Sequence, residues 1–433
     1  MGRSDYRQFL RLLAALLGVH AGASHAQIRL PPITVPTQPV TGIARQATDL
    51  ASNTVSTALS DVRSLRIQAL LKANPSVLDR DRDGNLIVRG ELLASGPVGH
   101  GAGVALPAGV TVLRTRSLEG LDLELTVLAV APHRSLARVL KALRAADPQG
   151  IYDYNHVYLT VGDPVDTGPR AAGPASAAAP AGAPRAPSIG LIDSGVDTAH
   201  AALAHAVVVS WGCEHPVPAA HGTAVASLIA GDDPPFHGAA PRAHLFAADV
   251  YCDRATGGAV DAVAGAFAWL IERAVPVVNV SLVGPRNAAL EAVIRHVQSL
   301  GQLVVAAVGN DGPAAPPLYP AAYPGVIGVT AVDAKRRVLL EANRGPQVRF
   351  AAPGADLLAA AAGGGYQPVR GTSYAAPIVA GLLGARCADP EPGCGARAAE
   401  ELAREAIPLG GGAPNPVYGA GLVGERVRTA PAQ

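Results

Sequence analysis

From residue 188 to residue 386, short apolar stretches alternate with longer segments that are rich in small residues and have the spacing of helices. A helix that connects two strands makes them parallel, and a parallel sheet needs helices on both faces to cover its apolar side chains. This alternation predicts an α/β fold with a mostly parallel sheet and helices on both faces. The expected strands are 188–193, 244–251, 276–282, 303–309, 326–333 and 348–354, and the expected helices are 221–230, 259–274, 288–300 and 371–386.

Four polar residues lie at the ends of these segments. Asp193 ends the first strand and His221 begins a helix. Asn310 follows the strand 303–309, and Ser373 lies among small residues at the start of the last helix. Each residue alone has an ordinary structural interpretation, as a turn or helix cap or a left-handed turn residue. Because open α/β sheets hold their ligands at the carboxyl ends of the strands, we expect the four residues to share one site.

Together the four residues have the chemistry of a nucleophilic serine. An aspartate can orient a histidine, the histidine can take the serine proton, and an asparagine amide can donate to the developing oxyanion. The chain order Asp193, His221, Ser373 is not that of the α/β-hydrolases, and no serine lies in a Gly-x-Ser-x-Gly elbow. The triplets 166–168 and 193–195 match the aspartic-protease motif, but they are too close in sequence to belong to two separate lobes.

The segments that carry these residues resemble the four signature blocks of the subtilisin-like (subtilase) serine peptidases. The resemblance extends from about Pro187 to about Val423, and it includes the segments Val277–Leu282, Tyr319–Val329 and Tyr418–Val423. It implies a subtilisin-like fold and hydrolysis of peptide bonds in a polypeptide substrate. The roles that it implies are a catalytic triad of Asp193, His221 and Ser373 and an oxyanion donor, Asn310.

The same resemblance assigns substrate contacts. It places Ser281, Leu282 and Val283 along the substrate cleft, with Gly309 also in contact with the substrate. Many relatives have glycine at the position of Val283, and the larger side chain adds bulk near the primary specificity pocket. We therefore expect no broad preference for large aromatic side chains.

Cofactor binding is not predicted. The segment 231–243 is short and lacks the loop that forms the strong calcium site in some relatives. Asp232 and Asp233 remain possible calcium ligands, but the sequence does not support a calcium requirement. The turn 79–85 resembles the start of an EF-hand loop, yet Gly90 occupies the position where a bidentate glutamate is needed. We expect a turn before a strand there.

The first 26 residues have the features of a secretory signal peptide. Three arginines precede the apolar run Leu12–Val19, and Ser24–Ala26 offers small residues for cleavage before Gln27. This apolar run is too short to span a membrane, so no membrane anchor is predicted. The expected location is the periplasm or the extracellular space. The formal net charge of +1 gives no reason to expect a nucleic acid partner.

Export makes disulfides the favoured interpretation of the four cysteines. Three pairings are possible, and we favour Cys213–Cys252 together with the short loop Cys387–Cys394. A zinc site is the alternative, but no two cysteines lie two to four residues apart.

Residues 27–162 form a separate N-terminal region. Helical spacing over 43–73 is followed by a strand 121–130, a helix 135–146 and a strand 151–161. This order resembles the small α/β prosegment of many subtilases, which implies a folding helper and intramolecular inhibitor. An independent binding domain is the alternative.

The remaining boundaries follow from composition. Residues 163–187 form a Pro/Ala/Gly-rich linker, a natural place for a maturation cut. The expected catalytic domain covers 188–426 and is followed by a tail, 427–433. The prediction is an exported serine endopeptidase made as a proenzyme. Two alternatives remain, a catalytically idle subtilase scaffold that binds a partner and a hydrolase of non-protein esters or amides.

Overall fold

The computed structural model describes residues 57, 59, 62–99, 106–160, 186–388 and 393–429. The predicted signal peptide, most of the predicted linker, the first part of the helix 43–73 and residues 430–433 of the tail lie outside these residues. All described residues belong to one unit, Thr48–Gln433.

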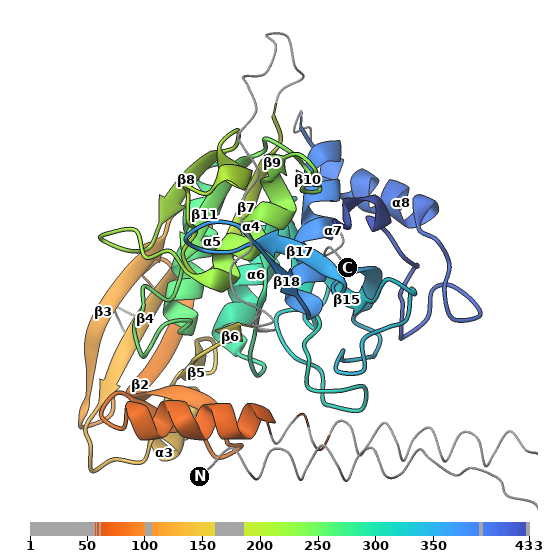
Figure 1. The fold of residues 1–433 in the computed structure, drawn as a ribbon. Helices are drawn as coiled ribbons and strands as arrows, with labels where there is room; N and C mark the ends of the chain where they lie inside the picture. The colour runs from red at the N-terminus through yellow and green to blue at the C-terminus, as the bar shows by residue number, and fades with distance from the viewer. Residues whose placement is uncertain are drawn as a thin grey trace, which may run out of the picture. The chain divides into compact units, whose positions relative to one another are not determined.

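A parallel sheet forms the centre of the C-terminal domain, as predicted (Figure 1). All of its strand pairs are parallel, and β7, which ends on Asp193, lies in the interior of the sheet. The strand order is β16 (Val348–Pro353), β15 (Ile327–Val332), β14 (Leu303–Ala307), β12 (Val277–Val280), β7 (Ser188–Asp193), β11 (His244–Asp249) and β8 (Val207–Trp211).

Helices cover both faces of this sheet, because successive strand side chains point to opposite faces. Leu191 packs in the apolar cluster that contains the helices of one face, and its neighbour Ile192 packs in the cluster of the other face. The first face carries α4 (Ala220–Ala230), α7 (Thr372–Arg386) and α8 (Cys394–Glu405). The second carries α5 (Val260–Ile271) and α6 (Ala288–Ser299).

The predicted strands and helices of this domain are all present, but several further elements were not predicted, among them β8, β17 (Leu357–Ala360), β18 (Tyr366–Val369) and α8. β8 is an edge strand whose Val207 is half-exposed, so it lacks the continuous apolar pattern of a buried strand. The hairpin of β17 and β18 packs beside the first face, and α8 follows α7.

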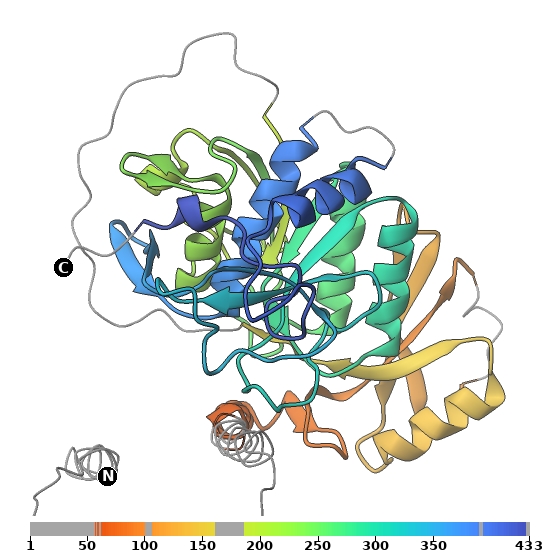
Figure 2. The ribbon, with the colours of Figure 1, turned by 90° about the vertical axis from the view of Figure 1, so that its right-hand side faces the viewer.

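The N-terminal domain is a second sheet, antiparallel and five-stranded. Its helix α3 (Leu136–Ala146) packs on one face through Val139, Leu140 and Leu143. The opposite face contributes side chains such as Leu93 and Leu118 to the apolar cluster of α5 and α6, so those helices lie between the two sheets (Figure 2). The strands are β1 (Leu78–Arg80), β2 (Leu86–Pro97), β3 (Val110–Leu118), β4 (Leu123–Val130) and β5 (Ile151–His156).

Two details of this domain bear on the predictions. The turn before β2 is confirmed, and the Asp81 carboxylate in it accepts hydrogen bonds from Asn85 and lies 3.1 Å from His156 Nε2. The helix at 62–73, within the predicted helical segment, is also present. Val62 and Leu65 are exposed, whereas Ile67 is buried.

Both favoured disulfides are present, Cys213–Cys252 and Cys387–Cys394. Among the residues that the structure describes, no helix is long and apolar enough to cross a bilayer.

Asn287 joins the two domains and also caps α6. Its side-chain oxygen accepts from the backbone N–H groups of Ala289 and Leu290, and its amide nitrogen donates to the Tyr154 carbonyl and to His156 Nδ1. Its exposed fraction is 0%. Every hydrogen-bonding direction of this side chain is therefore used inside the protein.

We predict that Asn287→Ala lowers the free energy of unfolding by about 2–4 kcal/mol, because it removes a helix cap and leaves buried partners unsatisfied. Chemical denaturation of the full chain measures this loss. Arg295→Ala, which removes an exposed ion pair on the same helix, is the matched control and should change stability by less than about 0.5 kcal/mol. Equal effects of the two changes would contradict this account of Asn287.

Candidate active site

A hydrogen bond joins Asp193 at the end of β7 to His221 in the first turn of α4. The distance between Asp193 Oδ1 and His221 Nδ1 is 2.8 Å, and the aspartate is fully buried. The same oxygen accepts from the backbone N–H and hydroxyl of Ser194. An ionised carboxylate in this place makes Nδ1 the protonated nitrogen of the ring, so Nε2 is the basic one.

The close approach of α4 to the end of β7 depends on a glycine after the histidine. A Cβ atom at Gly222 would lie 2.1 Å from the Ser194 carbonyl oxygen. The Gly222 N–H instead donates to the Ser194 hydroxyl over 3.0 Å. The His-Gly pair of the sequence motif is therefore explained by packing: the histidine faces the aspartate only if the next residue has no side chain.

Ser373 is the second residue of α7, and contacts of its neighbours place it beside these groups. The Ser281 hydroxyl donates to the Ser373 carbonyl over 2.9 Å. The ring of Tyr374 lies 5.4 Å from the ring of His221, centroid to centroid. Ser373 is fully buried, and the structure thus brings the N-terminus of α7 to the carboxyl ends of β7 and β12.

Asn310 is held by a residue that sequence reasoning missed, Thr372. The Asn310 side-chain oxygen accepts from both the backbone N–H and the hydroxyl of Thr372, at 3.1 and 3.0 Å. The same hydroxyl accepts from the Gly309 N–H at 3.2 Å. Since the amide oxygen is bound on the Thr372 side, the amide N–H groups are the donors that remain for an oxyanion.

The cleft beside Ser373 contains a stretch of the chain's own N-terminal domain. β13 (Leu282–Val283) pairs antiparallel with β6 (Leu159–Thr160), with Leu282 opposite Thr160. On the other side of this stretch, the Tyr158 N–H donates to the Gly258 carbonyl, and Val157 bridges to Ala259. Residues 157–160 therefore lie as an extended strand between two segments of the catalytic domain, the way a peptide substrate binds by strand addition.

The side chain of Tyr158 fills a buried pocket. It is fully buried, and its hydroxyl donates to the Pro285 carbonyl over 2.6 Å. A Cβ atom at Gly284 would lie within 2.7 Å of the Tyr158 ring, so glycine at 284 makes the room for this ring.

Apolar side chains fill the space between Ser281 and the strand end at Gly309. Val283 and Leu318 pack against each other, and both are at most 9% exposed. Leu318 lies 2.5 Å from where a Cβ atom at Gly309 would be. The N–H and C=O of Gly309 are both bound within the protein. Gly309 can therefore contact a substrate by lining a pocket, and not through its backbone hydrogen bonds.

The helix at 62–73 also contacts this region. Arg63 donates to the carboxylate of Asp311, the residue after Asn310, over 3.0 Å. Arg66 donates to the carbonyl and the hydroxyl of Thr160, the last described residue of the segment in the cleft. Sequence reasoning could not find these contacts, because they join residues far apart in the chain.

The possible calcium ligands have protein partners. Asp232 bonds to Arg242 and His237, and the Arg242 charge is among the contacts that lower its pKa in spite of burial, which acts in the opposite direction. Asp233 accepts from the Tyr366 hydroxyl. Within the described ranges, the one cluster with metal-ligand geometry comprises Cys213, Asp249 and Cys252, and its two cysteines are already bonded to each other.

Comparison with known families gives one match that covers more than half of the chain. The model described as "Subtilase family" matches residues 185–421. Among curated relatives, subtilisin E of Bacillus subtilis (strain 168) is 34% identical over 203 residues, which are 45% of this chain and 53% of that protein. Thermitase of Thermoactinomyces vulgaris is 30% identical over 231 residues, or 51% of this chain and 81% of that protein. The chain spans about half the length of the first curated relatives that it matches.

Solved structures show the same fold. Fervidolysin from Fervidobacterium pennivorans, described as a keratinolytic enzyme related to subtilisin, superposes with a TM-score of 0.65 at 19% identity. The match covers 82% of this chain and 63% of that one, so it extends beyond the central-sheet domain. The prenylagaramide maturation protease PagA matches 56% of this chain and 92% of its own, at 26% identity and a TM-score of 0.50.

We predict that Thr372→Val slows the reaction of Ser373 with a fluorophosphonate about 5- to 10-fold, the value of one hydrogen bond. The change keeps the side-chain shape but removes the hydroxyl that binds Asn310 and Gly309. Thr372→Ser retains the hydroxyl and should react at nearly the wild-type rate. A Thr372→Val protein that is folded and reacts like wild type would show that this hydroxyl does not position Asn310.

Proposed function

The chain belongs to the subtilase family, and from this membership and the geometry of the site we propose that it is a serine endopeptidase. The observation that carries the proposal is the pairing of β6 with β13, because an extended peptide lies along the cleft next to Ser373. A polypeptide is therefore a substrate that fits the cleft. Hydrolysis of non-protein esters alone would leave this peptide-binding groove without a role.

The reaction assigns one step to each group. His221 Nε2 takes the proton of the Ser373 hydroxyl while the serine oxygen attacks the peptide carbonyl. Asp193 keeps the ring oriented through Nδ1 and stabilises its positive charge. The Asn310 amide donates to the oxyanion, which donors of this kind stabilise by about 10²–10³-fold in rate, a magnitude known from subtilisin itself. The leaving amine takes the proton from His221, and water then hydrolyses the acyl-enzyme by the same route.

The N-terminal domain acts as an inhibitory prosegment in this proposal. Its segment 157–160 occupies the substrate groove, and Tyr158 and Arg66 add side-chain contacts. Thr160 lies opposite Leu282, the residue after Ser281, whose hydroxyl binds the Ser373 carbonyl. We place the maturation cut after residue 161, at the start of the Pro/Ala-rich linker and one residue before the predicted linker boundary. Residues 161 and 162 lie outside the described residues.

Export fits this assignment. The N-terminal sequence has the features of a signal peptide, and the two disulfides need an oxidising compartment to persist. We place the enzyme in the periplasm or outside the cell.

The test is a fluorescent fluorophosphonate applied to purified wild type and to Ser373→Ala, read on a denaturing gel with mass spectrometry of the chain termini. We expect label only on wild type, on a shortened chain that begins at residue 162 or close to it, because Ser373 is the proposed nucleophile and the probe can bind once the prosegment has been cut and has left the groove. The Ser373→Ala chain should stay unlabelled and uncut at this position.

Two other outcomes would change the proposal. Label on an uncut chain would keep the peptidase and remove the maturation scheme. Folded wild-type protein that takes no label, even after limited proteolysis of the N-terminal domain, would favour an idle subtilase scaffold.

The packing of Val283 and Leu318 leads us to propose a preference for small side chains at the residue before the scissile bond. The double change Val283→Gly and Leu318→Gly opens this space, so we expect it to raise kcat/KM for peptides with phenylalanine at that position at least about tenfold, since a few buried methylene-sized groups decide such selectivity. Peptides with alanine there are the internal control. If both enzymes prefer phenylalanine equally, these two residues do not limit the pocket.

A further inference from the structure

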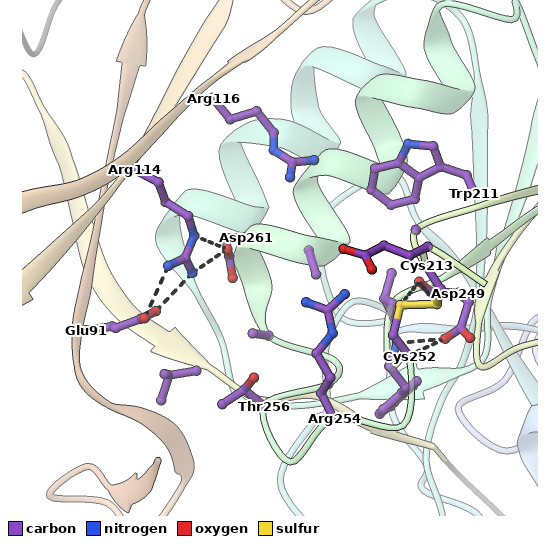
Figure 3. Close-up of a pocket in the computed structure, with 18 residues that line it drawn as sticks. Glu91, Arg114, Arg116, Trp211, Cys213, Asp249, Cys252, Arg254, Thr256 and Asp261 are labelled. Atoms are coloured by element: carbon purple, nitrogen blue, oxygen red, sulfur yellow. Dashed lines mark hydrogen bonds and ion pairs between the residues drawn. A yellow bond between two sulfur atoms is a disulfide. The ribbon is translucent and has the colours of Figure 1, made fainter. Parts of the chain in front are cut away.

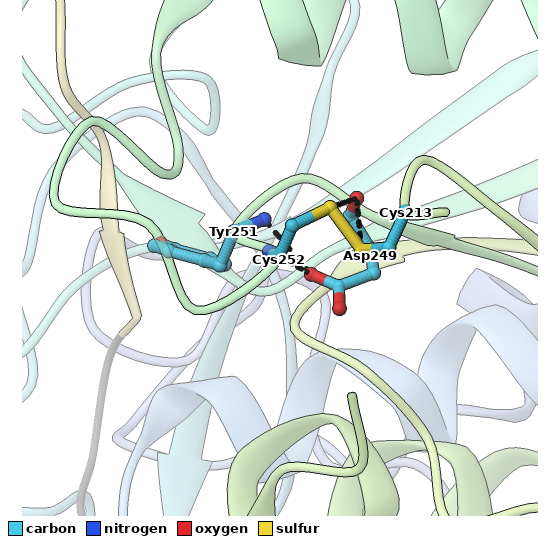
Figure 4. Close-up of a disulfide and its surroundings, with 4 residues drawn as sticks. All are labelled: Cys213, Asp249, Tyr251 and Cys252. Atoms are coloured by element: carbon cyan, nitrogen blue, oxygen red, sulfur yellow. Dashed lines mark hydrogen bonds between the residues drawn. A yellow bond between two sulfur atoms is a disulfide. The ribbon is translucent and has the colours of Figure 1, made fainter. Parts of the chain in front are cut away.

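The loop from Asp249 to Ala259 forms one wall of the substrate groove. Two hydrogen bonds and a disulfide hold the first residues of this loop. The Asp249 carboxylate accepts from the backbone N–H groups of Tyr251 and Cys252, at 2.8 and 2.9 Å. The disulfide joins Cys252 to Cys213, which follows β8 (Figure 4). Cys252 and Asp253 both have left-handed backbone, with φ of 47° and 51°. Non-glycine residues adopt this conformation only where their surroundings require it.

This loop borders a cavity on one side, so on that side it is not held by packing against other side chains. The cavity has a volume of about 820 Å³ and lies between the N-terminal sheet and the catalytic domain (Figure 3). It does not include Asp193, His221 or Ser373 in its lining. Its walls include Arg114 and Glu91 from the N-terminal domain, and Tyr251, Cys252, Arg254 and Gly257 from the loop. Besides backbone hydrogen bonds such as that from the Gly258 N–H to the Val250 carbonyl, the disulfide and Asp249 hold the loop in position beside the cavity.

Tyr251 uses this position to contact the peptide in the groove. Its hydroxyl donates to the carbonyl oxygen of Tyr158 over 2.8 Å. The N–H of Tyr158 donates to Gly258 on the same wall, also over 2.8 Å. The phenol thus binds a main-chain carbonyl, which any peptide offers, and not a particular side chain.

We propose that Tyr251 is a substrate-binding residue, anchored by Asp249 and the Cys213–Cys252 disulfide, that makes the enzyme favour extended peptides. The inference rests on the proposed peptidase function, with residues 157–160 standing in for a substrate. With the cut after residue 161, the bonded carbonyl belongs to the fourth residue before the scissile bond. A peptide with only two residues before that bond lacks the carbonyl and gains nothing from Tyr251.

The surroundings of the Tyr251 side chain keep its hydroxyl protonated, so that it can donate a hydrogen bond. Burial raises the pKa of Tyr251 well above its usual value, and the negative charge of Asp193 acts in the same direction. The hydroxyl therefore stays protonated, and able to donate, at neutral pH.

The experiment compares mature wild type with Tyr251→Phe on two peptides that share their residues around the scissile bond. One peptide has six residues before that bond and the other has two. For the long peptide we expect KM to rise about 3- to 10-fold with little change in kcat, because a hydrogen bond formed equally in the bound and transition states is lost. For the short peptide neither constant should change.

Two control proteins sharpen the test. Tyr366→Phe removes a phenol hydrogen bond of the same kind to Asp233, outside the groove, and should behave like wild type on both peptides. The pair Cys213→Ser with Cys252→Ser releases the loop and should raise KM for the long peptide in the same direction, while labelling of Ser373 by the fluorophosphonate shows that the protein is folded.

The possible results distinguish the proposed role of Tyr251 from the proposed peptidase function. An unchanged KM of Tyr251→Phe for the long peptide overturns the role of Tyr251, even though the enzyme is active. An equal loss on both peptides also overturns it, since the residue would then act on the reacting groups. If wild type cleaves neither peptide, the proposed peptidase function itself is wrong.

Discussion

The buried hydrogen bond between Asp193 and His221 constrains the rest of this structure. A carboxylate with no exposure is costly to bury unless it is hydrogen-bonded. Asp193 Oδ1 accepts from the histidine and from Ser194, whereas Oδ2 has no hydrogen-bond partner among the described residues. For this pairing, α4 must reach the end of a central strand, which requires glycine at 222. The parallel sheet supplies the frame, because β7 pairs with β11 and β12, and a shift of its register would break the backbone hydrogen bonds on both sides.

The proposed nucleophile, Ser373, is positioned by a second set of hydrogen bonds at the same edge of the sheet. Ser281, after β12, holds the backbone of Ser373, and Thr372 holds Asn310, after β14. Residues that follow two neighbouring strands, β12 and β14, thus hold the first residues of α7 in place. The proposed catalytic groups are therefore held by hydrogen bonds within the protein, which is the condition under which oxyanion donors act without reorganisation.

Much of this was predictable from the sequence, and the limits have a physical cause. Periodicity located the central strands and helices, because each is buried and carries an unbroken apolar pattern. The edge strand β8 was not predicted, because its solvent-exposed outer side leaves it without an unbroken apolar pattern. The hairpin β17–β18 could have been predicted, because three glycines, 363–365, separate two short strand-like runs.

The residues of the site also fall into two groups. Some lie in local sequence motifs, and others are positioned by contacts with residues distant in the chain. Asp193, His221, Asn310 and Ser373 lie in recognisable local motifs. Thr372, Leu318, Tyr251 and Arg66 act through contacts with residues distant in the chain or through a loop held by a disulfide. No single-sequence pattern marks such positions, because folding alone brings the partners together.

The interface between the domains supports the proposal that residues 157–160, which bind like a substrate, act as an inhibitor. The segment 157–160 makes the strand contacts available to any extended peptide. The N-terminal sheet adds a large apolar contact with α5 and α6 and a polar network in which Arg114 and Asn155 bind Asp261. These contacts do not involve the proposed cut site, so we expect that cleavage after residue 161 alone leaves the N-terminal sheet bound to the catalytic domain. On this proposal, lasting activity would require that the sheet, and not only the segment, be removed.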